Sequence, residues 1–552
     1  MQLLETMYLP RLKYPISIVI AIMVSIGFCN TAVGDFRSFR FLLFLVLLLV
    51  LIQLLCIDVL VYCLLLKGPL LRIDRFIQSN NSRKLALFLL LSWSVYLIAY
   101  FPGVLSFDTS FQLVQFFGNP SHGIFPMTDN SLFTDHHPIF TTLFMGSVVK
   151  LMHCFFSYNV SLWFLCFLMA FVQASLFAWQ FSLLSSIIDN RRTLTLLYLF
   201  YCIFPAFAYF CCVPCKDIIF CICLIGFLNI WISIYAKSPT LNTFILLFLF
   251  ALLCALSKKT TVYVFLLVCI VLLFVHVPAK RGVFVSLISV ICIVQVLMPL
   301  FLFPLFLVSK GSVIETLGPL YQCTARYCKE YPSDVSDEEK VVIDSVLGYE
   351  GLGDRYDYRL ADNVIHYWDG VDQWPSADKL KAYLVVFIKQ GLRHPDAYLR
   401  AFFAQESGWF SFDERLYFPE GSGSLLVSAE NGQPCFERPI FFQSASSVLS
   451  SALQLIERLP FIGLLFSPIT YLVSIVLILA NSIVSYKMGR SKCNMAVLWL
   501  SIPILCMIPF LLLSPTSMVS TNFEAVRYFL PFIYSVPLLL VMSGTKLKPV
   551  SA

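Results

Sequence analysis

Ionisable residues that follow directly on apolar runs mark the places where this chain can do chemistry. Asp108 lies in PGVLSFDTSFQ, just beyond one such run. A carboxylate at the hydrocarbon boundary loses part of its hydration, so we expect its pKa to rise and the group to serve as a general base. The structural alternative is that Ser106 or Asp108 caps the start of a helix.

A second polar cluster, TDHHP, brings Asp135, His136 and His137 together. Asp135 and His136 are candidate ligands for a divalent cation such as Mg²⁺ or Mn²⁺, while the His pair can instead face a polar pocket that holds a phosphate. Neighbouring side chains on a helix diverge by about 100°, so both His bind one ion only where the backbone is irregular. A metal requirement therefore stays open.

Two very short turns carry lysines. Lys216 and Asp217 stand in PCKD, and Lys258 and Lys259 stand in SKKT. Lysines at a helix N-terminus can bind a phosphate, and a lipid phosphate lies at about this depth. The alternatives are a local Lys216–Asp217 charge pair with snorkelling, and lysines that are neutralised by ordinary lipid headgroups.

Arg527, in EAVRY, adds a guanidinium at the start of the last apolar run. Arginine makes bidentate contact with phosphate or carboxylate, and the alternative is an i, i+3 pair with Glu524. Taken together, a carboxylate, two His, three Lys and an Arg on one face describe a pocket for an anionic lipid. In such a pocket the carboxylate can act as a general base, and the basic side chains can bind a phosphate.

The composition indicates that lipid surrounds most of the chain. Of 552 residues, 59% are hydrophobic and only 13% are charged, and the mean hydropathy is +0.83. Soluble domains average about 25% charged residues, so the chain is not a soluble enzyme. The balance of 38 Lys and Arg against 32 Asp and Glu excludes a nucleic-acid binder.

The apolar runs predict an all-α polytopic membrane protein. A helix needs about 20 mostly apolar residues to cross a bilayer. Runs of that kind occur twelve times, at about 15–33, 41–66, 85–102, 160–187, 194–213, 217–236, 241–257, 261–278, 283–308, 461–485, 495–513 and 527–543.

Basic residues orient these spans. Lys and Arg number 17 in one set of short loops and six in the other, so the first set is cytoplasmic and both termini lie on the cytoplasmic side of the plasma membrane. The segment 138–157 would be a thirteenth span, but counting it would put the basic loops 67–84 and 188–193 on opposite faces. We therefore expect 138–157 to be a re-entrant or interfacial helix on the outer face.

Residues 309–460 form the only large polar insertion, with 14 Lys and Arg against 22 Asp and Glu. We expect a compact, mainly helical extracytoplasmic domain, in which Cys323 and Cys328 are near enough in sequence to bridge. The other divisions are an anchor of two helices with a basic cytoplasmic loop at 1–84, a membrane core at 85–308 that includes the outer loop 103–157, and C-terminal transmembrane helices at 461–552.

The motifs as a set resemble those of a bacterial family of multispanning proteins grouped with the GT-C type glycosyltransferases, to which protein mannosyltransferases and aminoarabinose transferases belong. The resemblance covers about residues 85–540. It rests on PGVLSFDTSFQ, HHP, PCKD, SKKTTVYV and EAVRYFLP, and in the polar insertion on QCTARY, SDEEK, ADNV and HPDAYLRAF.

The resemblance implies a polyprenyl-phosphate-linked sugar as donor. It implies that Asp108 is the catalytic carboxylate of the first outer loop, and that the basic residues surround the donor phosphate, namely Lys216, Lys258, Lys259 and Arg527. In many related enzymes the corresponding loop contains a Lys and two Pro, whereas this chain has HHP there. The resemblance therefore does not imply that this loop contacts the phosphate.

The predicted function is an inverting glycosyltransferase of the bacterial plasma membrane that transfers a sugar to a saccharide or glycopolymer of the envelope on the outer face. The outer domain would bind this acceptor, with aromatic residues able to stack on sugar rings, although such residues are more often core: Trp368, Trp374, Trp409 and Tyr417.

Two other readings stay open. The first is a transporter or flippase for a lipid-linked saccharide, which would carry charged residues in mid-span, where only Asp58 is found. The second is a structural envelope protein, in which replacing Asp108 by Asn would have no functional cost.

Overall fold

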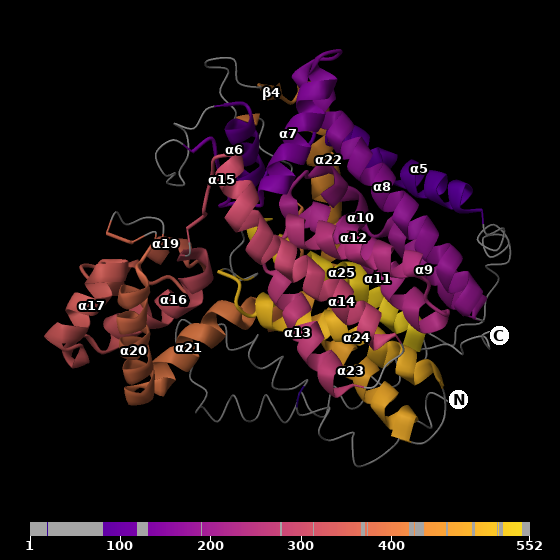
Figure 1. Ribbon diagram of the computed structural model, residues 1–552. Coiled ribbons are helices and arrows are strands. Elements are labelled where there is room, and N and C mark those ends of the chain that lie inside the picture. Colours follow the sequence, from indigo (N-terminus) through magenta and orange to yellow (C-terminus); the bar gives the residue numbers. More distant parts are fainter. Residues whose placement is uncertain are drawn as a thin grey trace.

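The computed structural model describes the part of the chain that carries the candidate residues (Figure 1). It covers Val19, 81–118, 131–188, 190–275, 279–312, 314–365, 370–372, 374–418, 424–425, 435–459, 462–487, 492–515, Ser517 and 523–543. The two spans expected at 15–33 and 41–66, and most of the basic loop that follows them, lie outside the described residues.

The all-α prediction is confirmed, since helices make up nearly all of the described structure. The strands are four segments of two residues each, in two ribbons. β1 (Phe133–Thr134) pairs in parallel with β2 (Val308–Ser309), and β3 (Ser424–Leu425) pairs antiparallel with β4 (Phe436–Glu437).

Among the described residues, five helical segments are long and apolar enough to cross a membrane. They are α5 (Ser82–Ala99), α8 (Tyr158–Ile187), α11 (Lys216–Ala236), the continuous stretch of α14 (Lys280–Cys292), η3 (Ile293–Leu302) and α15 (Phe303–Leu305), and α25 (Phe523–Ser543). A sixth is bent by 50° between α9 (Arg191–Ile203) and the pair formed by α10 (Pro205–Tyr209) and η2 (Phe210–Cys212).

Further apolar helices fall short of that length over their described side chains. They are α7 (Ile139–His153), α12 (Leu241–Ser257), α13 (Thr261–Phe274), α23 (Pro468–Lys487) and α24 (Lys492–Leu511). The structure thus shows a multi-pass helical protein, and the count of twelve spans stays a prediction. The segment expected to be re-entrant forms α7, a helix of 15 residues.

The apolar helices share one large core. Within it Trp231 of α11 and Trp499 of α24 stack with ring centroids 4.2 Å apart. Each indole Nε1 donates to the other residue's carbonyl oxygen, over 3.0 and 2.8 Å. This reciprocal pair satisfies two buried donors and fixes the two helices against each other.

Outward faces of the same helices keep large apolar side chains exposed. On α5 these are Leu87, Leu91, Val95 and Ile98, each more than half exposed. A stripe of this kind is unfavourable in water and costs nothing against lipid tails, so it fits a membrane location.

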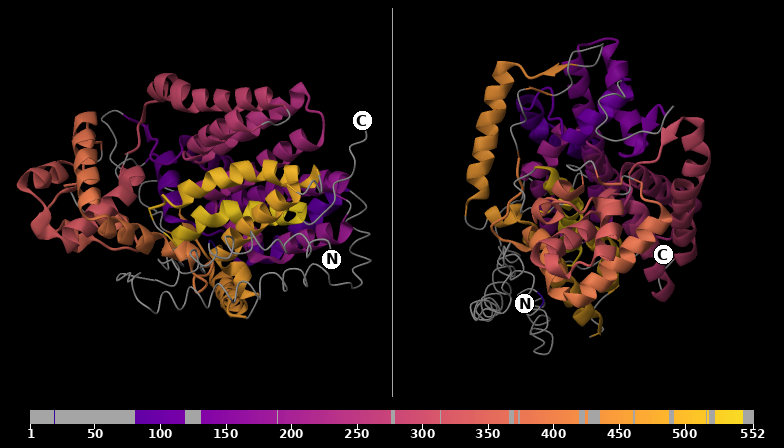
Figure 2. Two further views of the ribbon diagram at one scale, coloured as in Figure 1. Left: turned by 90° about the horizontal axis from the view of Figure 1, so that it is seen from below. Right: turned by 90° about the vertical axis from the view of Figure 1, so that its left-hand side faces the viewer.

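A second, smaller core lies within residues 317–398. Figure 1 and the left view of Figure 2 show its helices at one side of the apolar bundle, and in the right view of Figure 2 they face the viewer. The elements are α16 (Ile314–Glu330), η4 (Pro332–Asp334), α17 (Asp337–Leu347), α18 (Leu352–Arg355), α19 (Asp362–Ile365), α20 (Ala377–Arg393) and α21 (Pro395–Glu406). Cys323 and Cys328 are free thiols on α16.

The rest of the polar insertion packs on the apolar bundle. Trp409 in η5 (Ser407–Phe410) and Leu453 in α22 (Ile440–Glu457) belong to the larger core, and η7 (Gly463–Phe466) leads into α23. The α22 helix lies along α5, where the Ser450 and Tyr100 hydroxyls are hydrogen bonded at 2.8 Å, and the right-hand view of Figure 2 shows it on one flank.

A close approach joins α6 (Phe107–Phe116) to α7. Gly146 of α7 faces Phe116 so closely that an added Cβ would overlap the aromatic ring. Gln112 of α6 also donates to the hydroxyls of Thr141 and Thr142, over 2.7 and 2.9 Å. The candidate carboxylate on α6 is therefore positioned by α7.

We predict that Gly146→Ala destabilises the protein by about 1–3 kcal/mol, because the Phe116 ring must move and carry α6 with it. The measurement is the fraction of detergent-solubilised protein that stays monodisperse after heating. Restoring space with the additional change Phe116→Leu should recover stability, and a single Gly146→Ala variant as stable as wild type would contradict the close packing.

Candidate functional site

The start of α6 shows which residue caps the helix. The Ser106 hydroxyl accepts a hydrogen bond from the Thr109 backbone N–H at 3.2 Å, so Ser106 is the N-cap. The Thr109 hydroxyl donates to the Pro214 carbonyl oxygen at 2.6 Å, which ties α6 to the PCKD turn. Asp108 is not needed for capping, and its side chain serves another purpose.

Asp108 is the centre of a buried ion cluster. Its Oδ2 atom pairs with Arg527 Nη1 and, at 2.8 Å, with Lys216 Nζ. His137 Nδ1 lies 2.8 Å from the same Lys216 Nζ and 3.9 Å from Asp108 Oδ2. Four segments far apart in the sequence therefore meet at one carboxylate.

Asp217 extends the cluster on the other side of Arg527. Its Oδ1 atom accepts from Lys258 Nζ at 2.6 Å, and its Oδ2 atom lies 3.7 Å from Arg527 Nη1. The Tyr528 ring lies beside both cations, 5.1 Å from Lys258 Nζ and 5.4 Å from Arg527 Cζ, within the range of cation–π attraction.

The third carboxylate, Asp135, pairs with Lys259. The Lys259 Nζ atom lies 2.8 Å from Asp135 Oδ2 and also donates to the Asp135 carbonyl oxygen. The β1–β2 ribbon holds this loop, since the Asp135 N–H donates to the Ser309 carbonyl oxygen at 2.8 Å. Gly311 is required beside it, because a Cβ there would lie 2.7 Å from the Asp135 carbonyl oxygen.

These contacts decide between the alternatives that the sequence left open. Within the described residues Lys216 makes its ion pair with Asp108, and Asp217 makes its ion pair with Lys258. The Lys216 charge still acts on Asp217, so local charge balance accounts for only part of the arrangement. Arg527 reaches Asp108 and Asp217 across the bundle, and the Glu524 side chain lies outside the described residues.

The electrostatics of Asp108 contradict the expected rise of its pKa. Asp108 is only 7% exposed, and burial alone raises the pKa, but the Arg527 guanidinium and the Lys216 ammonium outweigh burial and hold it well below its usual range. The carboxylate therefore stays ionised and is a weak proton acceptor.

The pKa values of Asp135 and His137 shift in the directions that burial favours, up for the carboxyl group and down for the imidazole. At Asp135 burial raises the pKa more than Lys259 lowers it. At His137 burial, and then the Lys216 charge, hold the pKa well below its ordinary value, so the ring is neutral at pH 7. Asp135 is therefore a better general base than Asp108.

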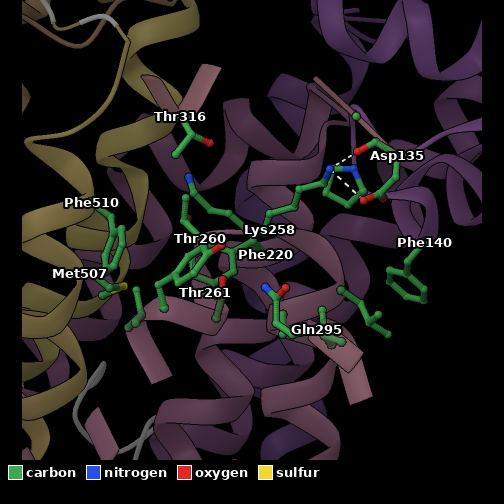
Figure 3. A pocket seen from close by; sticks show the side chains of 18 of the residues that line it. Asp135, Phe140, Phe220, Lys258, Thr260, Thr261, Gln295, Thr316, Met507 and Phe510 are labelled. Carbon is green, nitrogen blue, oxygen red and sulfur yellow. Dashed lines mark hydrogen bonds and ion pairs between the residues drawn. The ribbon is translucent and has the colours of Figure 1, made fainter. Parts of the chain in front are cut away.

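A cavity of about 620 Å³ opens next to the cluster (Figure 3). Its lining contains Asp135, Lys258 and Lys259, whereas Asp108 and His136 are not among the described residues that form it. Lys310, Thr260, Thr261 and Tyr528 also line the cavity. Figure 3 shows Lys258, Thr260 and Thr261 between Asp135 on one side and Met507 and Phe510 on the other.

Most of the remaining wall is apolar and comes from membrane helices, with Gln295, Thr316 and Ser514 as further polar members. Val264 of α13, Met298 of η3 and Phe532 of α25 all face the cavity, with Leu511 at the end of α24. The Thr261 hydroxyl is buried at its polar part without a hydrogen-bond partner among the described residues. A phosphate oxygen would satisfy this hydroxyl, as a buried polar group requires.

Sequence reasoning missed many of the lining residues, among them Lys310, Thr261, Gln295 and Tyr528. Of these, Lys310 gave a usable signal, since it closely follows an apolar run. Thr261, Gln295 and Tyr528 lie inside helices, where the sequence does not reveal which side faces a cavity.

The metal candidates Asp135 and His136 do not form a recognisable cation site. The His136 and His137 rings contact edge to face with centroids 4.8 Å apart. Across the described residues there is no group of three or more His, Cys, Asp or Glu side chains that could hold an ion.

We predict that Asp108→Asn destabilises the folded protein by about 3–5 kcal/mol, because it leaves Arg527 and Lys216 buried without the charge that compensates them. The fraction of protein that stays monodisperse after heating measures this loss. Asp135→Asn is the matched control, since its partner Lys259 is 44% exposed and keeps its hydration. Equal losses in the two variants would contradict the buried cluster.

His137 should make stability depend on pH. Burial depresses the pKa of His137 in the folded state, so the unfolded chain takes up the proton at a higher pH than the folded chain does. The neutral His137 ring therefore lowers the free energy of unfolding as the pH falls below about 6.5, the ordinary pKa of histidine, and has no such effect above it. We predict that His137→Asn, which keeps an acceptor for Lys216, flattens the decline in melting temperature between pH 7 and 5. His153→Asn, on the exposed end of α7, should keep the wild-type slope.

The comparisons with known proteins give a family and no activity. No curated protein and no solved structure matches the chain. The resemblance to GT-C glycosyltransferases therefore stays a prediction. Residues 71–549, most of the chain, match a family of unknown function, and the protein thus belongs to the DUF6020 family.

Proposed function

We propose that the protein is a membrane glycosyltransferase of GT-C type. It takes a sugar from a polyprenyl-phosphate-linked donor and transfers it to a saccharide or glycopolymer of the bacterial envelope. The reaction takes place at the outer face of the plasma membrane, with twelve spans, both termini cytoplasmic and the 309–460 segment outside. The orientation rests on the distribution of Lys and Arg among the short loops.

The observation that carries this proposal is the mixed character of the 620 Å³ cavity. Its polar part has three lysines, Lys258, Lys259 and Lys310, with the Thr261 hydroxyl, and the rest of its wall is made by apolar helices. A lipid phosphate matches both parts, because its anionic head can bind the lysines and its long apolar tail can lie against the apolar wall. A water-soluble sugar phosphate would have no use for the apolar wall.

The carboxylates divide the work in this proposal. Asp108 organises the cations, because it is ion-paired twice and keeps its charge. Asp135 takes the base role expected for Asp108, because it lines the cavity and its pKa is raised. Lys258 and Lys259 stabilise the negative charge that develops on the departing phosphate.

The reaction then proceeds as one displacement. The acceptor oxygen bonds to the anomeric carbon of the sugar while the bond from that carbon to the phosphate oxygen breaks. The hydroxyl proton passes to the Asp135 carboxylate, and the polyprenyl phosphate leaves with the electron pair of the broken bond. Attack opposite to the leaving group inverts the anomeric configuration.

The test is transfer of radiolabelled sugar from a panel of undecaprenyl-phosphate-linked hexoses and pentoses, in membranes with matched amounts of each variant. We predict that Asp135→Asn lowers turnover by about 100-fold or more, as expected for loss of a general base. Asp378→Asn, on the surface of α20, should leave turnover unchanged. In wild type the rate should fall as the pH drops through the raised pKa of Asp135.

The lysines are tested separately. We predict that Lys310→Ala raises the KM for the donor several-fold, while Lys389→Ala on α20 does not.

Equal turnover in wild type and Asp135→Asn would remove Asp135 from the mechanism. No transfer from any donor, together with movement of the labelled lipid across the bilayer, would favour the alternative function of a flippase.

A further inference from the structure

A second cavity, of about 630 Å³, lies in the outer helical unit away from the ion cluster. It is lined by residues of α16, α18 and the segment that follows: Arg326, Lys329, Glu330, Asp354, Arg355, Tyr356, Asp357, Tyr358, Arg359 and Asn363. Its volume is within the usual range for small-molecule pockets, but almost no aliphatic side chain faces it. The ligand it fits is therefore polar.

The net charge of this cavity is positive, whereas the net charge of the segment around it is negative. The 309–460 segment carries 14 Lys and Arg against 22 Asp and Glu, whereas the cavity has four basic and three acidic side chains. A basic cavity on an acidic surface attracts an isolated anionic group. It does not suit a long polyanion, which the rest of the surface would repel.

Two of the three acids are already neutralised. Glu330 accepts from Arg326 Nε at 2.8 Å and from Arg400 Nη2 at 2.5 Å. Asp357 is bound by the Arg359 fork, with Nη2 2.8 Å from Oδ2 and Nε 3.0 Å from Oδ1. The excess of positive charge in the cavity is therefore available to a ligand.

Lys329 is the cation best placed to use that excess. It is exposed, and among the described residues it makes no ion pair; its Nζ atom lies 5.6 Å from the centre of the Tyr356 ring. Arg326 is buried and already bonded to Glu330 and to the Tyr356 hydroxyl. An anionic group entering the cavity would thus meet Lys329 first.

The rest of the lining offers what hydroxyl groups need. Tyr358 is half buried and makes no ring contact or hydrogen bond with another described residue, so its ring and hydroxyl are available. The Asp354 carboxylate accepts hydrogen bonds, and the Asn363 amide both donates and accepts. A ring face beside mixed donors and acceptors suits a polyhydroxylated ligand.

We propose that this cavity is a binding site for an acidic saccharide, a sugar unit that carries a carboxylate or a phosphate. Lys329 binds the anionic group, Tyr358 stacks on the sugar ring, and Asp354 and Asn363 bind the hydroxyls. The site does not depend on the transfer reaction proposed above, because it is separate from the 620 Å³ cavity and shares no lining residue with it.

The test is binding of trigalacturonate to the full-length protein in nanodiscs by calorimetry. Neutral maltotriose and inorganic phosphate are measured in parallel. We expect trigalacturonate to bind, and Lys329→Glu to weaken its affinity by about tenfold or more. Tyr358→Ala should also weaken it, whereas Lys389→Glu, which makes the same charge change on α20, should not. Lys329→Arg keeps the charge and should retain most of the binding.

Each other outcome decides the matter. Competition by inorganic phosphate that Lys329→Glu abolishes would support the anion subsite and favour a phosphorylated sugar. Maltotriose binding as tightly as trigalacturonate would overturn the need for an acidic group. Equal trigalacturonate affinity in wild type and Lys329→Glu, or no binding of either anion to folded protein, would overturn the site.

Discussion

The burial of the Asp108 carboxylate is the constraint on which the arrangement of the helix ends around it depends. A charge out of water is costly unless another charge and hydrogen bonds compensate it. Arg527 and Lys216 supply that compensation, and Asp217 balances Arg527 in turn. α6, α11 and α25 must therefore converge at this point, and the PCKD turn and the HHP loop are brought with them.

The outer segments are built to hold this arrangement. Arg438, only 3% exposed, donates to the carbonyl oxygens of Phe101 and Gly103, at the chain turn that precedes α6. The β1–β2 ribbon fixes the loop before α7 against the end of a membrane helix in the same way. Residues near both ends of the polar insertion thus position the segment that carries Asp108 and Asp135.

The two cavities differ in chemistry as their surroundings differ. The first lies against apolar helices and combines lysines with an apolar wall, which suits a lipid phosphate. The second lies in the outer unit and is polar throughout. Hydrogen bonds join the two regions, since the Ala361 N–H donates to the Pro515 carbonyl oxygen and Gln405 Nε2 donates to that of Ser514. Ser514 and Pro515 line the first cavity, so the outer unit is anchored at its edge.

The sequence by itself determined the helical class, the approximate ends of the apolar helices and the residues of the ion cluster, because charges beside apolar runs are costly enough to stand out. Only the tertiary structure decided which charges pair. Asp108 meets Arg527 across 419 residues and Asp217 meets Lys258 across 41, distances at which no periodicity carries information. The direction of the Asp108 pKa shift followed from that pairing, since nearby cations outweigh burial, and a sequence shows burial without showing the neighbours.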